Sequence, residues 1–146
     1  MELQQLATNG IRLEVASAGP ARGELVILLH GFPESADAWQ QQVPALAGAG
    51  LRVLAPHQRG YAGSSKPSAL ADYRLSMLAR DVVGLADAAG AGRFSVVGHD
   101  WGAAIGWHLA TVYPERVQRL VVLNGAHTGT VATHALRHPT QVVRSW

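Results

Sequence analysis

The stretch Val96-Val97-Gly98-His99-Asp100-Trp101-Gly102-Ala103 decides the fold, because an apolar strand runs here into a small-residue turn and a helix begins at once. Small residues two positions before and after a central side chain force a tight strand-to-helix turn. Gly98 and Gly102 are expected to lie where any side chain would collide with the neighbouring strand or helix. The turn should therefore project the Asp100 carboxylate from the end of the strand and leave the N–H of Trp101 free for an anion.

Around this turn, apolar strands and amphipathic helices alternate. Leu25-Val26-Ile27-Leu28-Leu29 is a continuous apolar run, typical of a parallel strand that is covered on both faces. In residues 73–89 the apolar positions recur at three and four, which indicates one face of a helix. We expect further strands at 52–55, 94–97 and 116–123 and further helices at 38–47 and 101–113. This alternation predicts an α/β sheet with right-handed crossovers.

Three segments of the chain differ from this alternating pattern. Residues 3–7 and 11–15 flank Thr8-Asn9-Gly10, and Asn-Gly between alternating segments predicts a β-hairpin. Residues 56–68 are rich in Gly, Ser and Pro and should form a loop. After Asn124 the pattern dissolves, and 133–146 suggests one more helix.

Composition restricts the class of protein. With 146 residues, 48% hydrophobic and 15% charged, the chain suits one globular domain. A net charge of +2 with scattered Arg residues argues against nucleic-acid binding, and the absence of cysteine excludes disulfides and thiolate metal sites. No apolar run reaches the length of a membrane span and no secretory signal is visible, so a cytoplasmic protein is expected. Neither residues 90–92 nor 60–66 fit a nucleotide-binding motif, so we expect no cofactor and no metal.

Three motifs resemble those of α/β-hydrolases of the epoxide hydrolase group. They are His30-Gly31-Phe32-Pro33-Glu34-Ser35, the segment 55–67 around Arg59-Gly60-Tyr61, and Gly98-His99-Asp100-Trp101-Gly102-Ala103, in the order and approximate spacing of that group. The resemblance implies the N-terminal part of the α/β-hydrolase fold: a mostly parallel sheet with an N-terminal antiparallel hairpin and helices on both faces, without the last strands and the lid. Residues 1–146 would then form one incomplete core domain, and 133–146 would begin the lid.

The resemblance also implies a chemistry for Asp100. A carboxylate can attack an epoxide carbon and leave an alkyl-enzyme ester, and a helix N-terminus stabilises its negative charge. Hydrolysis of that ester creates an oxyanion, which the family assigns to the backbone N–H groups of Phe32 and Trp101. The substrate would be a small apolar epoxide. The residues expected to shape the two motifs are His30, Gly31, Pro33, Gly98, His99 and Gly102.

Other interpretations of Asp100 stay open. An aspartate between a strand and a helix is most often an N-cap. Haloalkane dehalogenases share the Asp-Trp pair but usually have a polar residue at the position of Phe32, and fluoroacetate dehalogenases tend to have arginine where Trp101 stands. A serine esterase is disfavoured, because position 100 offers no hydroxyl. A non-catalytic truncated remnant is the alternative from another class.

Several family features are missing or changed. The family's catalytic acid and histidine follow the sixth strand, but after Glu115 the chain has no Asp or Glu, so we assign neither general acid nor general base and expect impaired turnover. His127 resembles the histidine of a structural Pro-His-Pro turn. His57 stands where the family usually has aspartate, which puts the packing of its loop in question. The strand at 117–123 would be an uncovered apolar edge, which predicts self-association.

Overall fold

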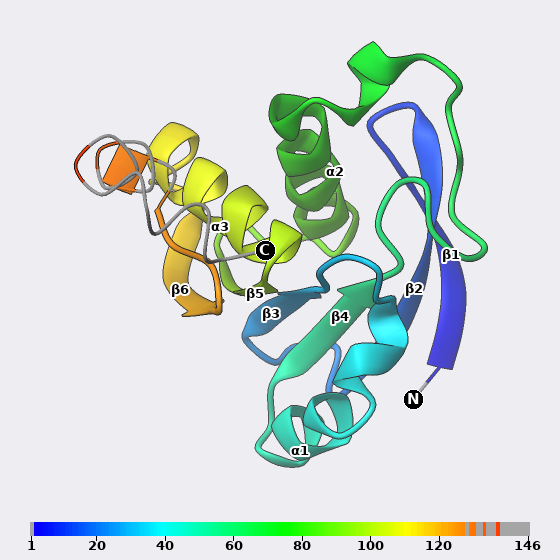
Figure 1. Ribbon diagram of the computed structural model, residues 1–146. Coiled ribbons are helices and arrows are strands. Elements are labelled where there is room, and N and C mark those ends of the chain that lie inside the picture. The colour runs from blue at the N-terminus through cyan, green and yellow to red at the C-terminus, as the bar shows by residue number, and fades with distance from the viewer. Residues whose placement is uncertain (1, 128, 131–132, 134–136, 138–146) are drawn as a thin grey trace.

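The strands of the chain form one sheet in a computed structural model that describes residues 2–127, 129–130, 133 and 137 (Figure 1). The sheet in this part of the chain is six-stranded, in the order β1-β2-β4-β3-β5-β6. The strands are β1 (Glu2–Thr8), β2 (Ile11–Ala18), β3 (Leu25–Leu29), β4 (Arg52–Pro56), β5 (Phe94–His99) and β6 (Val117–Leu123).

The N-terminal hairpin is confirmed. β1 and β2 pair antiparallel, and β2 in turn pairs antiparallel with β4. Asn9 and Gly10 both have positive φ, 44° and 76°, as a type I′ turn between two strands requires. From β4 onward the pairs β4-β3, β3-β5 and β5-β6 are parallel, so the carboxyl ends of these strands meet at one edge of the sheet.

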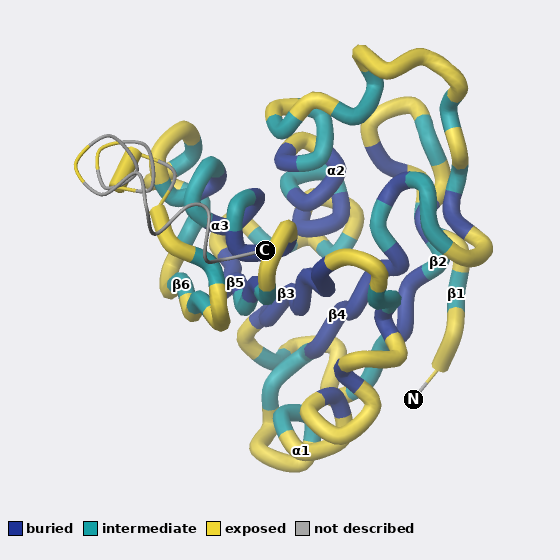
Figure 2. The backbone as a smooth tube through the Cα atoms, in the orientation of Figure 1, coloured by how far each residue is buried: buried dark blue, intermediate teal, exposed yellow. Residues whose placement is uncertain are grey.

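The helices cover both faces of the sheet. On one face lie α2 (Leu75–Ala88) and α3 (Trp101–Val112), and on the other lie α1 (Gln42–Gly48) and the short 3-10 helix η1 (Ala36–Trp39). β3 separates the two layers, because Leu25, Ile27 and Leu29 pack toward α2 and α3 while Val26 and Leu28 pack toward η1 and α1. All five residues of β3 are buried, and the tube through β3 and β4 is dark in Figure 2.

The single helix expected at 38–47 is wrong. The structure has η1 followed by α1, with a break at Gln40 and Gln41. A continuous helix from residue 38 would place Pro44 in its interior, where the ring clashes with the carbonyl of Gln40. Starting α1 at Gln42 puts Pro44 in the first turn, where its missing N–H leaves no hydrogen bond unmade.

Two further segments differ from expectation. The loop expected at 56–68 spans residues 57–69, and a 3-10 helix, η2 (Leu70–Tyr73), precedes α2. The proposed lid start at 133–146 lies outside the described residues except for Thr133 and Arg137, which are helical. In the part of the chain that the structure describes, β6 has β5 on one side and no strand on the other.

Candidate active site

The turn after β5 places Asp100 between strand and helix in a strained conformation, with φ of 52° and ψ of −113°. Its two glycines are required by close backbone contacts. A Cβ on Gly98 would lie 2.3 Å from the carbonyl oxygen of Gly102, and a Cβ on Gly102 would lie 2.2 Å from the carbonyl oxygen of Leu29. Larger residues at either position would push α3 away from β3 and β5.

Asp100 occupies the N-cap position of α3, yet its side chain makes no capping hydrogen bond. Instead, Asp100 Oδ1 accepts a hydrogen bond from the backbone N–H of Phe32 at 3.0 Å. The interpretation of Asp100 as an ordinary N-cap is therefore wrong. The N–H of Trp101 is the first of α3 and has no acceptor within the helix.

The loop that follows β3 lies beside this turn because β3 and β5 are neighbouring parallel strands, with Leu29 in register with Gly98. This loop carries His30, Gly31, Phe32 and Pro33, and its Phe32–Pro33 peptide bond is cis. A Cβ on Gly31 would approach the Cβ of Asp100 to 2.6 Å. The structure thus brings the first and third sequence motifs into direct contact.

A pair of ionisable side chains joins the same two motifs. His99 Nδ1 lies 2.9 Å from Glu34 Oε2, and that oxygen also accepts a hydrogen bond from the N–H of Gly31 at 3.3 Å. The hydrogen bond with His99 lowers the pKa of Glu34. Sequence reasoning treated His99 as motif-shaping and gave Glu34 no role, because no local pattern shows that residues 65 positions apart are in contact.

His30 is fully buried beneath the loop and ties it to the chain after β4. Its Nδ1 lies 2.9 Å from the carbonyl oxygen of Gly31, and its Nε2 accepts a hydrogen bond from the N–H of Gln58 at 3.1 Å. Nδ1 therefore carries the proton. Burial lowers the pKa of His30, so the ring is held in this neutral form.

A pocket of about 260 Å³ opens beside the turn and shares Gly31 and Trp101 with the surroundings of Asp100. Its walls are largely aromatic and aliphatic, with Tyr61, Tyr73, Leu78 and Ile105 among them. The Tyr61 ring packs edge-on against His30 at 4.7 Å between ring centroids. Burial and the negative charge of Asp100 raise the pKa of Tyr61, which keeps its hydroxyl protonated.

His127 lies apart from these residues and packs against α3. Its ring meets Trp107 edge-on at 5.1 Å between centroids, and Trp107 Nε1 donates to the carbonyl oxygen of Gly125 at 3.1 Å. Its Nδ1 accepts a hydrogen bond from the N–H of Gly129 at 3.2 Å. These contacts give His127 a packing role in the turn after β6.

The described residues bring together no group of three or more His, Asp or Glu side chains of the kind that holds a metal ion. Among their helices none has the length and apolar character that crossing a bilayer demands.

Comparison with known proteins identifies the fold family. The family model described as alpha/beta hydrolase fold matches residues 24–144. The chain belongs to the α/β hydrolase fold family. The strained turn at Asp100 and the parallel strands that flank it form the N-terminal part of that fold.

Within the family, the similar proteins include several named epoxide hydrolases. Epoxide hydrolase A of Mycobacterium tuberculosis is 47% identical over 138 residues, which cover 94% of this chain and 42% of that protein. The crystal structure of epoxide hydrolase A from Mycobacterium thermoresistibile superposes with a TM-score of 0.83 at 42% identity, covering 92% of this chain and 44% of the other. The resemblance to the epoxide hydrolase group is thereby confirmed.

A relative with a broader name matches at similar strength. The AB hydrolase superfamily protein YfhM of Bacillus subtilis is 42% identical over 145 residues, which cover 99% of this chain and 51% of that protein. The α/β hydrolase chain described here thus spans about half the length, or less, of the curated relatives that it matches.

Proposed function

We propose that this chain carries the nucleophile and the oxyanion hole of an epoxide hydrolase. Asp100 is the nucleophile, and the backbone N–H groups of Phe32 and Trp101 are the oxyanion donors. The observation that carries the proposal is the 3.0 Å hydrogen bond from the Phe32 N–H to Asp100 Oδ1. The Asp100 side chain makes this bond although it stands at the N-cap of α3, where it makes no capping hydrogen bond. The relatives named epoxide hydrolase support the same reaction.

In the first step, a carboxylate oxygen of Asp100 attacks one carbon of the epoxide ring. A new C–O bond forms, the ring C–O bond breaks, and the epoxide oxygen takes the electron pair and then a proton from a general acid. Because Oδ1 is held by Phe32, Oδ2 is the oxygen that attacks. The product is a hydroxyalkyl ester of Asp100.

In the second step, water attacks the carbonyl carbon of that ester and loses a proton to a general base. Oδ1 becomes the oxyanion, and it already faces the Phe32 N–H in the resting state. Collapse of the tetrahedral intermediate breaks the Cγ–Oδ2 bond, the leaving oxygen takes the proton back from the base as the diol departs, and the oxygen from water remains in the Asp100 carboxylate. Loss of one such donor typically costs about 3 kcal/mol in the transition state.

The apolar pocket beside Asp100 supports a small apolar epoxide as the substrate. Its volume of about 260 Å³ exceeds that of the roughly 150 Å³ apolar cavity that binds benzene in another protein. Gly31 and Trp101 lie both in its wall and next to Asp100, so a substituent of the substrate in this pocket keeps the ring carbon near the nucleophile.

Turnover requires a base that the described residues do not offer. In this part of the chain the Asp100 carboxylate accepts its hydrogen bond from Phe32, and no histidine bonds to it. We infer that the 146-residue chain forms the ester slowly and hydrolyses it more slowly still.

Covalent labelling tests the proposal. The purified chain is incubated with a phenyl-substituted epoxide, and intact mass and peptide mapping locate any adduct. We expect one equivalent of epoxide on the peptide that contains Asp100, no adduct in Asp100→Asn, and no steady multiple turnover. An adduct that forms equally in the Asn variant, or sustained turnover by the wild-type chain, would contradict the proposal.

A haloalkane dehalogenase is the second candidate, because the side chain that follows Asp100 suits a halide. Trp101 is 61% exposed, and an indole N–H can hold a departing halide ion. A parallel incubation with a 1-haloalkane separates the two: alkylation of Asp100 by the haloalkane with none by the epoxide favours the dehalogenase. Alkylation by neither reagent favours a non-catalytic remnant.

A further inference from the structure

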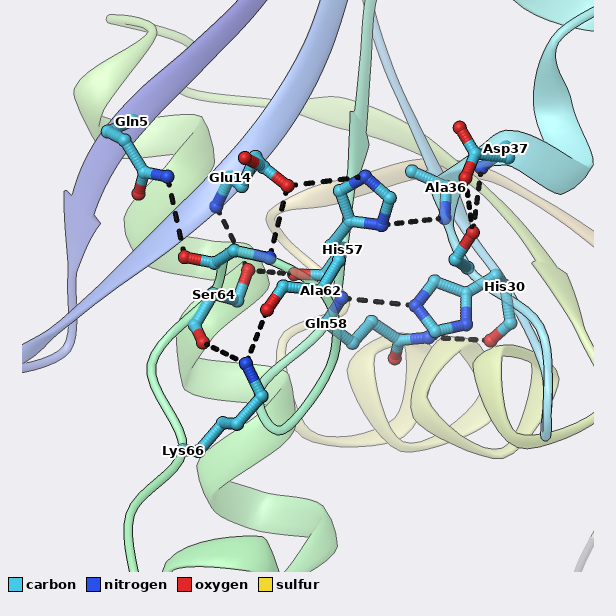
Figure 3. Close-up of polar contacts among 12 residues, drawn as sticks. Gln5, Glu14, His30, Ala36, Asp37, His57, Gln58, Ala62, Ser64 and Lys66 are labelled. Atoms are coloured by element: carbon cyan, nitrogen blue, oxygen red, sulfur yellow. Dashed lines mark hydrogen bonds and ion pairs between the residues drawn. The ribbon is translucent and has the colours of Figure 1, made fainter.

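His57 is buried at the start of the loop that follows β4, with only 5% of its surface exposed. Figure 3 shows its ring between the side chain of Glu14 and the backbone of Ala36. Nδ1 accepts a hydrogen bond from the N–H of Ala36 at 3.2 Å, and Nε2 lies 3.6 Å from Glu14 Oε2. Because a backbone N–H can only donate, Nδ1 must be unprotonated, and the proton of the neutral ring lies on Nε2, toward Glu14.

Glu14 is itself held in place by the loop that contains His57. Its Oε2 accepts a hydrogen bond from the N–H of Gly63 at 3.1 Å, and its backbone oxygen accepts one from the N–H of His57 at 2.8 Å. The Ser64 hydroxyl accepts from the N–H of Glu14 and donates to the carbonyl oxygen of His57. These hydrogen bonds form a closed network that fixes the orientation of the His57 imidazole.

His57 and its neighbour Gln58 hold the two ends of the loop that carries Phe32. At the upstream end, the Gln58 N–H donates to His30 Nε2 and the Gln58 side chain donates to the His30 carbonyl oxygen at 2.6 Å. At the downstream end, His57 Nδ1 accepts from Ala36. Residues 31–35 lie between these two anchors.

We propose that His57 is a positioning residue for the oxyanion hole. With its proton directed at Glu14, it holds the N–H of Ala36 through Nδ1 and so fixes the loop that presents the Phe32 N–H to Asp100. The role in an oxyanion hole rests on the proposed function, whereas the effect of His57 on the loop does not. Histidine stands here where the resembled family usually has aspartate, and its Nδ1 supplies the acceptor for the Ala36 N–H.

Nitrogen NMR of the labelled chain tests the inference without any substrate. We expect the imidazole of His57 to show the Nε2–H tautomer near neutral pH. We also expect the Ala36 amide to be protected from hydrogen exchange, and to lose about ten-fold of that protection when the acceptor on residue 57 is removed, as loss of one hydrogen bond implies. The amide of Val53, in the buried β4, serves as the reference and should keep its protection.

Two variants separate positioning from general packing. His57→Asp keeps an acceptor at this position, so the Ala36 amide should remain protected. His57→Leu has no acceptor, so the Ala36 and Phe32 amides should each lose about ten-fold of their protection, and hydrolysis of the Asp100 ester should slow by about ten-fold. An Nδ1–H tautomer, or wild-type protection of Ala36 in His57→Leu, would overturn the inference. Absence of any adduct with the expected NMR results would instead count against the proposed function.

Discussion

Gly31 and Asp100 are packed so closely that a Cβ placed on Gly31 would lie 2.6 Å from the Cβ of Asp100 and 2.9 Å from its Oδ1. No real Cβ sits at such distances, so the loop after β3 approaches Asp100 because residue 31 has no side chain. This approach is what allows the N–H of the next residue, Phe32, to reach the carboxylate.

Gly31→Ala should therefore separate the loop from Asp100. We expect hydrolysis of the Asp100 ester to slow by about a hundred-fold, the usual effect of losing one oxyanion donor, while the chain still folds. The rate at which the aryl-epoxide adduct on Asp100 is lost after excess epoxide is removed, measured by mass spectrometry, checks this. Gly48→Ala is the matched control, because a Cβ on Gly48 at the end of α1 would meet nothing within 4 Å. Equal rates of adduct loss for the two variants would show that the contact is not needed.

Glu34 should make stability depend on pH in the acid range. Its pKa is below the ordinary value of 4.5 because His99 donates to it, so its contribution is present above pH 4.5 and is lost as the pH falls through the lowered pKa. Glu34→Gln should consequently unfold at a lower temperature than the wild type at neutral pH, and the difference should shrink below pH 4.5. The effect is small, because the side chain of Glu34 is 39% exposed.

Thermal unfolding followed by circular dichroism across this pH range provides the measurement. Glu115→Gln is the control, since Glu115 is exposed in the turn before β6. The explanation would fail if the difference between wild type and Glu34→Gln stayed constant down to acid pH.

Breaking the pair Arg59–Asp81 should destabilise the fold more than breaking any other ion pair described. Arg59 donates two hydrogen bonds to Asp81, at 2.9 and 2.7 Å, and the side chains are only 2% and 4% exposed. Asp81→Ala leaves a buried guanidinium unpaired, so we expect the free energy of unfolding to fall by about 3–5 kcal/mol.

The exposed ion pair Arg116–Asp87 serves as the control for Asp81→Ala. Asp87, whose side chain is 61% exposed, accepts from Arg116 at 2.6 Å, and Asp87→Ala should cost no more than about 1 kcal/mol. Urea unfolding monitored by tryptophan fluorescence gives both values. Similar losses for the two variants would mean that burial does not set the strength of these pairs.

Self-association through β6 is the fourth prediction. Val121 and Leu123 on this strand are 47% and 43% exposed, and one edge of β6 has no partner strand in the described part of the chain. We expect sedimentation at tens of micromolar to show species larger than a monomer, and Val121→Lys to reduce them because edge charges disfavour strand pairing. A sharp monomer peak for the wild type would contradict this prediction.

Features that depend on a few adjacent residues could be predicted from the sequence. Asn9-Gly10 indicated the hairpin, because these residue types tolerate the positive φ angles that the turn requires. The run Leu25–Leu29 indicated a strand buried on both faces. Gly98, Asp100 and Gly102 indicated a tight turn, because only small residues fit beside it. The break near Pro44 was also a local signal, and the expectation of one helix at 38–47 overlooked it.

The sequence by itself thus determined the order of strands and helices, the family and the turn that exposes Asp100, since dihedral preferences and hydrophobic periodicity act over short stretches. Only the tertiary structure decided what surrounds that carboxylate. Phe32 reaches Asp100 over 68 positions, Glu34 reaches His99 over 65, and His57 holds Ala36 over 21. These contacts exist because β3 lies between β4 and β5, which brings the loops at the ends of three strands together, and no short stretch of sequence encodes that arrangement.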